Sequence, residues 1–402
     1  MKLDHLMGEN SKLEWEDALS SLTRIDWTRD TKPIVITYLP TSLGNPYQSL
    51  LYRDLPSIGA TAIPATNVTV ARRLAEQLEG SAQCVTHLHW LNGVTRKAKS
   101  VEEAQSMSVA FAEELDQIVG FGGNIMWTVH NVLPHESRWP DVDVEIRKAV
   151  VQRAGRIHAM SPSTQKMCAS HFELPSENLI QIPHPSYIDA YPSWMTREQA
   201  RAMLGIPASA TVFLAFGRIR AYKGVTELIG AFTNLSQTQP GNYVLLIAGE
   251  SAADAEVQTS LSEASLRPDI IVADYKIPDR EVQVFFRAAD IGVYPYRQSL
   301  NSGAVALGLT FGVPAVIPRT IGEAAGTDSV WAELYDPGQE TGLRNALLEA
   351  SSRLCNEQTT KAAQQAAGNI APALVSPMFS RAVQDWLGGN VLAPHSTNVE
   401  PT

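Results

Sequence analysis

The chain has 402 residues, of which 44% are hydrophobic and 18% charged, so it can form two or three domains with apolar cores and is neither disordered nor fibrous. Acidic residues outnumber basic ones by 42 to 32, and a charge of −10 disfavours broad nucleic-acid binding, although a local basic cluster can still hold one phosphate ligand. The three cysteines, Cys84, Cys168 and Cys355, are far apart and odd in number. This argues against disulfides and zinc knuckles and fits a reducing cytosol.

No segment has the character of a secretion signal or a membrane span. The N-terminus carries several charges, and the longest uncharged run, between Arg297 and Arg319, contains two prolines and three glycines. We therefore expect a cytoplasmic protein, with peripheral contact at the inner face of a membrane left open.

Short apolar runs alternate with amphipathic helical patterns along most of the chain. In the first half the expected strands are 33–39, 61–65, 84–90, 124–131, 156–161 and 179–185. In the second half they are 211–217, 243–250, 269–275, 291–296 and 314–318. The expected helices include 69–79, 101–119, 143–154, 223–236, 278–289 and 302–311. This alternation is typical of parallel sheets that helices cover on both faces.

Eleven strands would make one overlong sheet, so the pattern predicts two doubly wound, Rossmann-like α/β domains that face each other across a cleft. The Pro-rich segment 183–192 marks the boundary between a first domain over 33–190 and a second over 191–375. The remaining segments are an N-terminal extension (1–32), a final helix (376–389) and a disordered tail (390–402). In such domains ligands bind where the strands end.

Basic residues follow the first strand of the second domain. The run TVFLAFG ends at Gly217, and Arg218 and Lys223 come next. A glycine permits a tight turn, and these two cations can converge on a diphosphate. A solvated strand–helix loop without a ligand explains the same residues equally well.

A second candidate phosphate site lies at Ser302 and Gly303, which open an apolar helix after the strand at 291–296. Ser302 is a favourable N-cap, and Gly303 lets a phosphate approach the free N–H groups of the helix start. The plainer alternative is a capped buried helix with no ligand. Asp290, just before the strand, is expected to be structural.

Three segments of the second domain together resemble a known family: FGRIRAYKG, the stretch 277–296, and the small-residue helix that ends in GVP. They look like the nucleotide-binding domain of GT-B glycosyltransferases and are similar to glycosyltransferase family 4, the group 1 superfamily. The resemblance covers 205–320 well and 33–190 more loosely, through HLHW, WTVHN and IPHP.

The resemblance implies that the second domain binds a nucleotide sugar. It assigns the donor diphosphate to Arg218 and Lys223 and to the helix start at Ser302 and Gly303. The nucleobase would face Tyr275, Lys276 and Ile277. In this fold the final helix commonly crosses back to the first domain.

The chain departs from that family at one point. Members usually carry two glutamates eight positions apart, where this sequence has Ser299 and Leu307. Tyr296, Arg297 and Asn301 could replace part of the missing polar surface. The loss of the pair favours an inverting transfer over a retaining one.

In the first domain, Gly44 and Asn45 precede Pro46, a favourable first-turn residue for the next helix. In the resembled fold this loop reaches the cleft, so Gly44, Asn45 and Tyr47 are candidate acceptor-binding residues. A plain helix cap is the alternative.

The strand NIMWTVHN ends in His130, and His135 and Glu136 follow. In related enzymes a histidine at this strand end contacts the donor sugar, and Glu136 or His135 could take the acceptor hydroxyl proton. Metal ligation is a rival interpretation, but the resembled enzymes generally need no bound metal. In the plainer alternative, His130 is a buried hydrogen-bonded histidine and Glu136 a surface acid that caps a helix.

Two further histidines, His87 and His89, alternate in THLHW, and we expect them to face opposite sides of a strand. Trp90 could stack on an acceptor sugar or belong to the core. His184, near the domain boundary, could touch substrate or linker.

These features together predict a cytoplasmic, metal-independent and cofactor-free glycosyltransferase. It would move a sugar from a nucleotide-diphosphate sugar to a hydroxyl of a saccharide or lipid-linked saccharide, in polysaccharide or glycoconjugate assembly. The alternatives are a non-catalytic GT-B partner subunit and a sugar-nucleotide epimerase. The expected partners are the donor and a saccharide or glycolipid acceptor, without nucleic acid.

Overall fold

A computed structural model describes residues 31–389 apart from 43, 135, 298, 299, 301, 325, 326, 328 and 329, together with residues 20, 22, 23 and 27. The chain divides into two compact units, which are described separately. Unit 1 comprises Met1–Pro183 with Ala373–Thr402, and unit 2 comprises His184–Pro372. Most of the expected extension 1–32 and the whole expected tail 390–402 lie outside the described residues.

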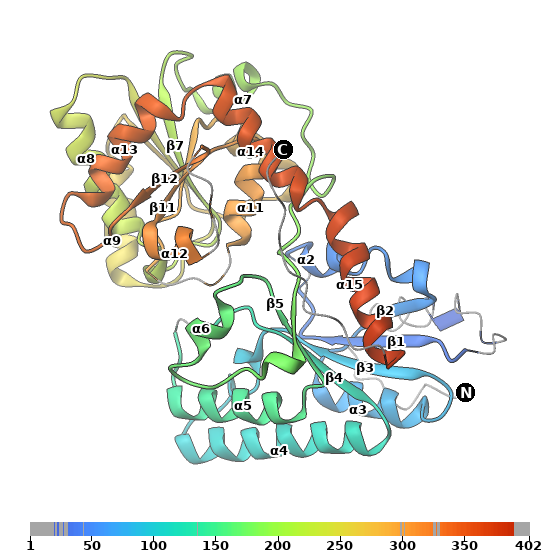
Figure 1. The fold of residues 1–402 in the computed structure, drawn as a ribbon. Helices are drawn as coiled ribbons and strands as arrows, with labels where there is room; N and C mark the ends of the chain where they lie inside the picture. The colour runs from blue at the N-terminus through green and yellow to red at the C-terminus, as the bar shows by residue number, and fades with distance from the viewer. Residues whose placement is uncertain are drawn as a thin grey trace. The chain divides into compact units, whose positions relative to one another are not determined.

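Unit 1 contains a six-stranded parallel sheet in the order β2-β1-β3-β4-β5-β6 (Figure 1). Its strands are β1 (Ile34–Leu39), β2 (Ala60–Pro64), β3 (Gln83–Leu88), β4 (Asn124–Thr128), β5 (Arg156–Ala159) and β6 (Leu179–Gln181). Its main helices are α2 (Tyr47–Leu51), α3 (Val68–Gln77), α4 (Val101–Gly120), α5 (Pro140–Arg153), α6 (Thr164–Cys168) and α15 (Pro372–Leu387). Ile36 at the centre of β1 pairs with Ala62 on one side and Val85 on the other, and its side chain is fully buried.

Side-chain caps explain where two of these helices begin. Asn67 accepts a hydrogen bond from the N–H of Val70 at the start of α3, and Ser100 accepts one from Glu103 at the start of α4. Each cap satisfies one of the N–H groups that a helix start leaves without a partner.

The last helix, α15, packs within unit 1 although about 190 residues separate it from the rest of that unit. The Ser376 hydroxyl accepts a hydrogen bond from the N–H of Asp54 (2.7 Å) and donates one to the carbonyl of Leu51 (2.8 Å). Phe379 is fully buried and stacks on the His87 ring, with 5.5 Å between the centroids. These contacts join the end of the chain to α2 and β3.

Unit 2 repeats the plan with a second parallel sheet in the order β12-β11-β10-β7-β8-β9. Its strands are β7 (Thr211–Phe216), β8 (Tyr243–Ala248), β9 (Ile270–Ala273), β10 (Ile291–Val293), β11 (Ala315–Pro318) and β12 (Ala332–Tyr335). Its helices are α7 (Arg197–Leu204), α8 (Val225–Thr238), α9 (Ala255–Ala264), α10 (Val282–Ala288), α11 (Gly303–Thr310), α12 (Arg319–Ala324), α13 (Gly342–Arg353) and α14 (Glu357–Asn369). The twelfth strand, β12, is an addition to the eleven expected. Its short run AELY includes a charged residue and carries little apolar signal.

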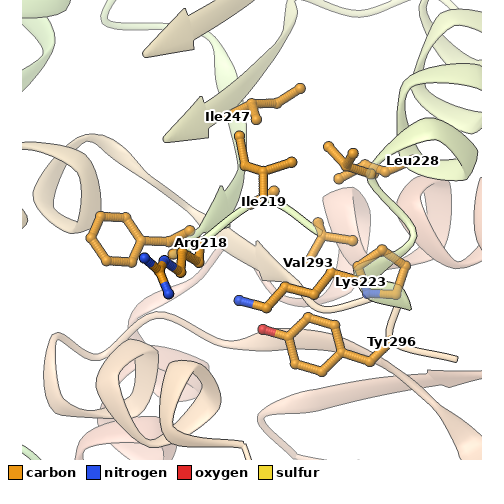
Figure 2. Close-up of a pocket in the computed structure, with 12 residues that line it drawn as sticks. Arg218, Ile219, Lys223, Leu228, Ile247, Val293 and Tyr296 are labelled. Atoms are coloured by element: carbon orange, nitrogen blue, oxygen red, sulfur yellow. The ribbon is translucent and has the colours of Figure 1, made fainter. Parts of the chain in front are cut away.

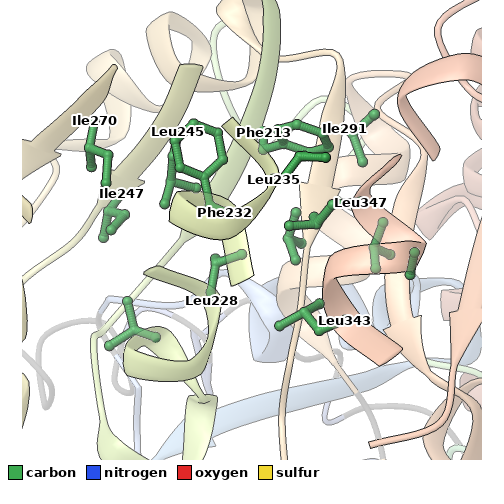
Figure 3. Close-up of a cluster of buried hydrophobic side chains, with 14 of the residues drawn as sticks. Phe213, Leu228, Phe232, Leu235, Leu245, Ile247, Ile270, Ile291, Leu343 and Leu347 are labelled. Carbon is green, nitrogen blue, oxygen red and sulfur yellow. The ribbon is translucent and has the colours of Figure 1, made fainter. Parts of the chain in front are cut away.

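The core of unit 2 lies on both faces of its sheet. Phe213 of β7 packs edge-on against Phe232 of α8, within a cluster that also includes Leu347 of α13 (Figure 3). Along β11, Val316 belongs to this cluster, whereas Ala315 and Ile317 belong to a second one with α11 and α14. Alternate side chains of one strand therefore enter two cores, which confirms the predicted doubly wound architecture.

Asp290 has the structural role expected for it. Its carboxylate accepts hydrogen bonds from the N–H of Val212 (2.8 Å) and from the Arg201 guanidinium (2.7 Å), and it pairs with Arg197. Arg201 is 2% exposed and also donates to the carbonyls of Ala208 and Ala210. This network joins α7 to the start of β10 and compensates for the burial of the guanidinium.

Candidate functional site

A pocket opens in unit 2 where β7, β8 and β10 end (Figure 2). It encloses about 320 Å³, part of which is open to solvent. Both predicted diphosphate-binding cations, Arg218 and Lys223, line it. The other lining residues are Ala215, Phe216, Gly217, Ile219, Val225, Leu228, Ile247, Val293, Pro295 and Tyr296.

Glycines allow the loops around this pocket to approach one another. Gly217 has φ +101° and Gly224 has φ +68°. A Cβ at Gly224 would lie 2.3 Å from the carbonyl oxygen of Pro295, and one at Gly249 would lie 2.3 Å from that of Gly217. Only glycine fits such positions without strain, so the strand-end signal in FGRIRAYKG reports a real steric requirement.

Lys223 is the deeper of the two cations. Its ammonium lies 5.6 Å from the centroid of the Tyr296 ring, and Figure 2 shows the two side chains running beside each other. Burial, and next the charges of Arg220 and Arg218, lower the pKa of Lys223 to about 8. A bound anion would offset both causes, so the pocket favours a negatively charged ligand.

Arg218 lies closer to solvent than Lys223. Its side chain is 68% exposed, and its guanidinium lies 3.6 Å from the Glu250 carboxylate at the end of β8. An exposed pair at this distance contributes little to stability, so Arg218 can exchange this partner for a ligand at low cost.

The predicted helix start lies near Lys223. The Ser302 hydroxyl accepts a hydrogen bond from the N–H of Val305 (3.2 Å), which makes it the N-cap of α11 as expected. Tyr296, whose ring lies beside the Lys223 ammonium, also forms a side-chain hydrogen bond with Ser302. Tyr296 therefore connects the cation to the positive end of the helix dipole.

Gly303 has two close neighbours. A Cβ at this position would lie 2.8 Å from the Tyr187 hydroxyl and 3.5 Å from Nε2 of His184. The pKa of His184 falls to about 4 because the ring is buried, although the bond from Nδ1 to the carbonyl of Pro185 (2.7 Å) opposes this. Tyr187 was missed from the sequence, because no strand-end pattern marks the linker in which it lies.

The predicted nucleobase residues do not gather around this pocket. Tyr275, Lys276 and Ile277 follow β9, the edge strand, which β7 and β8 separate from β10. The Tyr275 hydroxyl donates to Glu281 (3.1 Å), and Arg297 pairs with Glu227 of α8. Asn301 lies outside the described residues.

A second cluster of candidates lies in unit 1, where the adjacent strands β1, β3 and β4 end. The His130 ring stacks on Trp90 with centroids 4.2 Å apart, and the Tyr47 ring meets His130 edge-on at 5.1 Å. Residues from three separate segments of the sequence therefore converge. Strand adjacency brings them together, because parallel strands end at the same edge.

The loop before α2 is ordered by two amide side chains. Asn45 accepts a hydrogen bond from the N–H of Tyr47 (3.0 Å), while Gly44 is exposed with open space around it. Gln48, which is 3% exposed, donates to the carbonyl of Pro40 and accepts from the N–H of Ser42, both at 2.9 Å. Gln48 was not predicted from the sequence, because its position on a helix does not show that its side chain bonds the preceding loop.

The expectation that His87 and His89 face opposite sides of a strand is wrong. Their ring centroids lie 4.2 Å apart, and the Tyr52 hydroxyl lies 2.7 Å from a nitrogen of each ring. Side chains two residues apart on a strand share a face, and it is adjacent residues that alternate.

This pair belongs to a longer hydrogen-bonded series. Nδ1 of His89 lies 3.0 Å from Nε2 of His130, and Nε2 of His87 lies 2.7 Å from the Thr128 hydroxyl. From Thr128 the series continues through His158 to the carbonyl oxygen of Ile182. The signal in the sequence was that His87 and His89 stand at the end of one expected strand and His130 at the end of the next.

The structure describes one of the two predicted candidate bases. Glu136 is exposed in the loop between β4 and α5, and His135 lies outside the described residues. His130 itself is half-buried. The roles assigned to these three residues stay predictions.

The described part of the chain offers neither a metal-ligand cluster nor a membrane-spanning helix. Within it, no three or more His, Cys, Asp or Glu side chains come together as metal ligands. Among its helices, none combines the length and apolarity needed to cross a membrane.

Comparison with known proteins supports the family resemblance. Residues 196–324 match the family model for glycosyl transferases group 1. GDP-mannose:glycolipid 4-beta-D-mannosyltransferase of Xanthomonas campestris pv. campestris is 26% identical over 322 residues, or 78% of this chain and 82% of that protein. D-inositol 3-phosphate glycosyltransferase 1 of Catenulispora acidiphila is 26% identical over 66% of this chain and 64% of that protein.

Solved structures agree on the fold. HepE from Anabaena, in complex with UDP and glucose, has a TM-score of 0.64 at 13% identity, covering 88% of this chain and all of that one. Sucrose-phosphate synthase from Thermosynechococcus elongatus has a TM-score of 0.66 at 14% identity, covering 90% of this chain and all of that one. The chain thus carries a group 1 glycosyltransferase domain in residues 196–324, and it is a glycosyltransferase with the GT-B fold.

Proposed function

We propose that the protein transfers a sugar from a nucleotide-diphosphate donor, held by unit 2, to a hydroxyl of a saccharide or lipid-linked saccharide, held by unit 1. The observation that carries this proposal is the unit 2 pocket, where Lys223, Arg218 and the capped start of α11 offer positive charge together. As the glycosidic bond breaks, one further negative charge develops on the leaving diphosphate, and positive groups at this site would stabilise it.

We propose GDP-mannose as the first donor to test and a glycolipid as the first acceptor. Both come from the Xanthomonas relative, whose alignment spans 322 residues and so includes parts of both units. A lipid-linked acceptor would bring the protein to a membrane surface, which the predicted location at the inner face would allow.

In unit 1 the candidate acceptor site is formed by Trp90 and His130, against which the fully buried Tyr47 packs edge-on. Aromatic faces pack well against the apolar faces of sugar rings. His130 would hydrogen-bond the reacting sugar, and Glu136 or His135 would accept the acceptor proton in an inverting transfer. The anomeric configuration of the product, read by NMR, tests the inversion.

We further propose that transfer needs no resident metal, because the pocket cations would neutralise the leaving diphosphate. Dialysis against EDTA is then expected to leave the transfer rate unchanged. A loss of activity that Mg²⁺ or Mn²⁺ restores would contradict this.

The donor site can be tested by calorimetric titration of the whole chain with GDP, UDP and dTDP. We expect one nucleotide to bind selectively and its affinity to fall about 100-fold in Lys223→Ala, since a buried charge-assisted contact is worth about 1.5–3 kcal/mol. Lys361→Ala is the matched control, because this exposed lysine pairs with Glu357 of its own helix, α14. Absence of binding by the folded protein would overturn the donor-site assignment.

Turnover is tested with radiolabelled GDP-mannose and a lipid-linked saccharide. Label that appears in the organic phase supports the proposed reaction. Selective GDP binding without transfer to any saccharide acceptor would contradict the proposed acceptor and leave the proposed donor site supported.

A further inference from the structure

Unit 1 contains an unbroken series of hydrogen-bonded side chains that the proposed reaction does not require. It runs from His130 at the carboxyl edge of the sheet, across β3, β4 and β5, to the backbone carbonyl of Ile182. We call it the histidine series. Its members, in order, are His130, His89, Tyr52, His87, Thr128 and His158.

The carbonyl at the far end sets the direction of the first half of the series. Because the oxygen of Ile182 can only accept, Nε2 of His158 donates to it at 2.8 Å. The neutral His158 ring then has a bare Nδ1, which accepts from the Thr128 hydroxyl at 3.0 Å. Thr128 has a single hydroxyl hydrogen, so Nε2 of His87 donates to its oxygen at 2.7 Å.

The same assignment of donors and acceptors continues to His130, at the other end of the series. Nδ1 of His87 is bare and accepts from the Tyr52 hydroxyl, and the Tyr52 oxygen accepts from Nε2 of His89, both at 2.7 Å. Nδ1 of His89 is therefore bare and accepts from Nε2 of His130 at 3.0 Å. Every donor in the series follows from the single carbonyl acceptor.

The surroundings of His87, His89 and Tyr52 favour the uncharged forms that this assignment assumes. His87, His89, Thr128 and His158 are at most 1% exposed. Burial and the neighbouring imidazoles hold the pKa of His87 and of His89 well below the ordinary value, so both rings are neutral at pH 7. Burial raises the pKa of Tyr52 well above its ordinary value, so its hydroxyl keeps its proton.

We propose that the histidine series fixes the tautomer of His130, with the proton on Nε2 and Nδ1 as the basic nitrogen. Tyr52, His89, His87, Thr128 and His158 are then positioning residues, which act on the reaction only through His130. With its proton on Nε2, His130 can only accept a hydrogen bond at Nδ1. The series ends on a carbonyl oxygen, which cannot take up a proton and pass it to water. It therefore orients His130 and does not act as a proton-transfer path.

The tautomer can be read directly by ¹⁵N NMR of the whole chain with ¹⁵N-labelled histidine, in which each ring nitrogen reports whether it carries a proton. The His130 signals are assigned by their loss in His130→Gln. We expect His130, His89, His87 and His158 to carry the proton on Nε2 at pH 7. A His130 signal with the proton on Nδ1 would overturn the proposal.

Two substitutions break the series with little change in shape. Tyr52→Phe removes one hydroxyl and keeps the ring that packs on Phe379, and Thr128→Val replaces the hydroxyl by a methyl group. In both variants we expect the His130 signals to report a mixture of tautomers. Thr128→Ser keeps the hydroxyl and should restore the single tautomer, while Tyr243→Phe, at a half-buried tyrosine of unit 2, is the control. An unchanged His130 tautomer in both breaking variants contradicts the proposal.

The kinetic consequence rests on the proposed function. We expect Tyr52→Phe and Thr128→Val to lower kcat about tenfold, because His130 would lose the fixed tautomer of its hydrogen bond to the reacting sugar. GDP affinity should stay unchanged, and Thr128→Ser should recover most of the rate. If the wild-type protein shows no transfer, the proposed function fails and the NMR result still decides the tautomer. Altered NMR with unaltered kcat would refute the role of His130 in the reaction.

Discussion

At the scale of single residues, Lys223 is buried although its proposed role, diphosphate binding, requires a positive charge. Two neighbouring guanidinium groups and the apolar lining oppose its ammonium, and the Tyr296 ring favours it. A phosphate ligand would resolve this conflict, which is the reason to treat Lys223 as the centre of the donor site.

The lowered pKa predicts how nucleotide binding depends on pH. Lys223 is mostly charged below pH 8 and loses its proton as the pH rises through about 8. GDP affinity should therefore hold from pH 6.5 to 7.5 and fall about tenfold by pH 9, where about one tenth of the free protein still carries the charge. Calorimetry across this range measures it. Lys223→Met should lack this fall and Lys361→Ala should keep it. An equal pH dependence in all three proteins would show that the nucleotide, and not Lys223, titrates.

Backbone geometry at Gly224 gives a second residue-scale prediction. Gly224→Ala places a Cβ 2.3 Å from the carbonyl oxygen of Pro295 at a φ of +68°, so we expect it to lower the free energy of unfolding by about 1–3 kcal/mol. Gly230→Ala is the control, because this glycine of α8 has open space around it and should gain up to about 1 kcal/mol. Urea unfolding measures both. Equal stability of the two variants would contradict the steric argument.

At the scale of elements, α11 brings a capped start to the pocket and a body of small residues to the core. Gly308 leaves room for the Tyr294 hydroxyl, which a Cβ at that position would approach to 2.4 Å. The helix can therefore pack closely on β10, whose end lines the pocket. The position of the helix start therefore depends on this packing as well as on the Ser302 cap.

Two N-cap substitutions separate stability from binding. Ser302→Ala at α11 and Asn356→Ala at α14 each remove one side-chain acceptor, and each should cost about 1 kcal/mol in thermal or urea unfolding. Of the two, Ser302→Ala should also weaken GDP binding, by about fivefold, because the start of α11 is connected to Lys223 through Tyr296. The donor site does not include the start of α11 if the two variants bind GDP equally.

At the scale of the whole molecule, unit 1 is made of two segments of the sequence, whereas unit 2 is continuous. Unit 1 is completed by Ala373–Thr402, which follow all of unit 2. The contacts of α15 reach the histidine series itself, since Phe379 packs against both His87 and Tyr52. The last helix therefore contributes to the environment of His130 through its packing.

Phe379→Ala tests this dependence. Removing a fully buried phenylalanine should cost about 3–5 kcal/mol, and hydrogen exchange should show lost protection around Leu51 and β3 in unit 1. Leu374→Ala is the control on the same helix, because Leu374 is 53% exposed. Lost protection confined to unit 2 would contradict the placement of α15 in unit 1.

The sequence by itself determined the class of fold and the strand ends that matter. Apolar runs of four to eight residues, separated by helical patterns, reflect local burial and backbone preference, and these are properties of short segments. Glycines and cations after β7 and a serine before α11 could be identified for the same reason. The short strand β12 escaped because its own residues carry little apolar signal.

Only the tertiary structure decided which of these residues meet. Tyr47, Trp90 and His130 come together because β3 lies between β1 and β4, and strand order is not written in any one segment. The predicted nucleobase residues lie away from the pocket because β9 is at the sheet edge. The histidine series joins side chains up to 41 residues apart, through hydrogen bonds whose directions follow from one carbonyl oxygen, so only folding could assemble it.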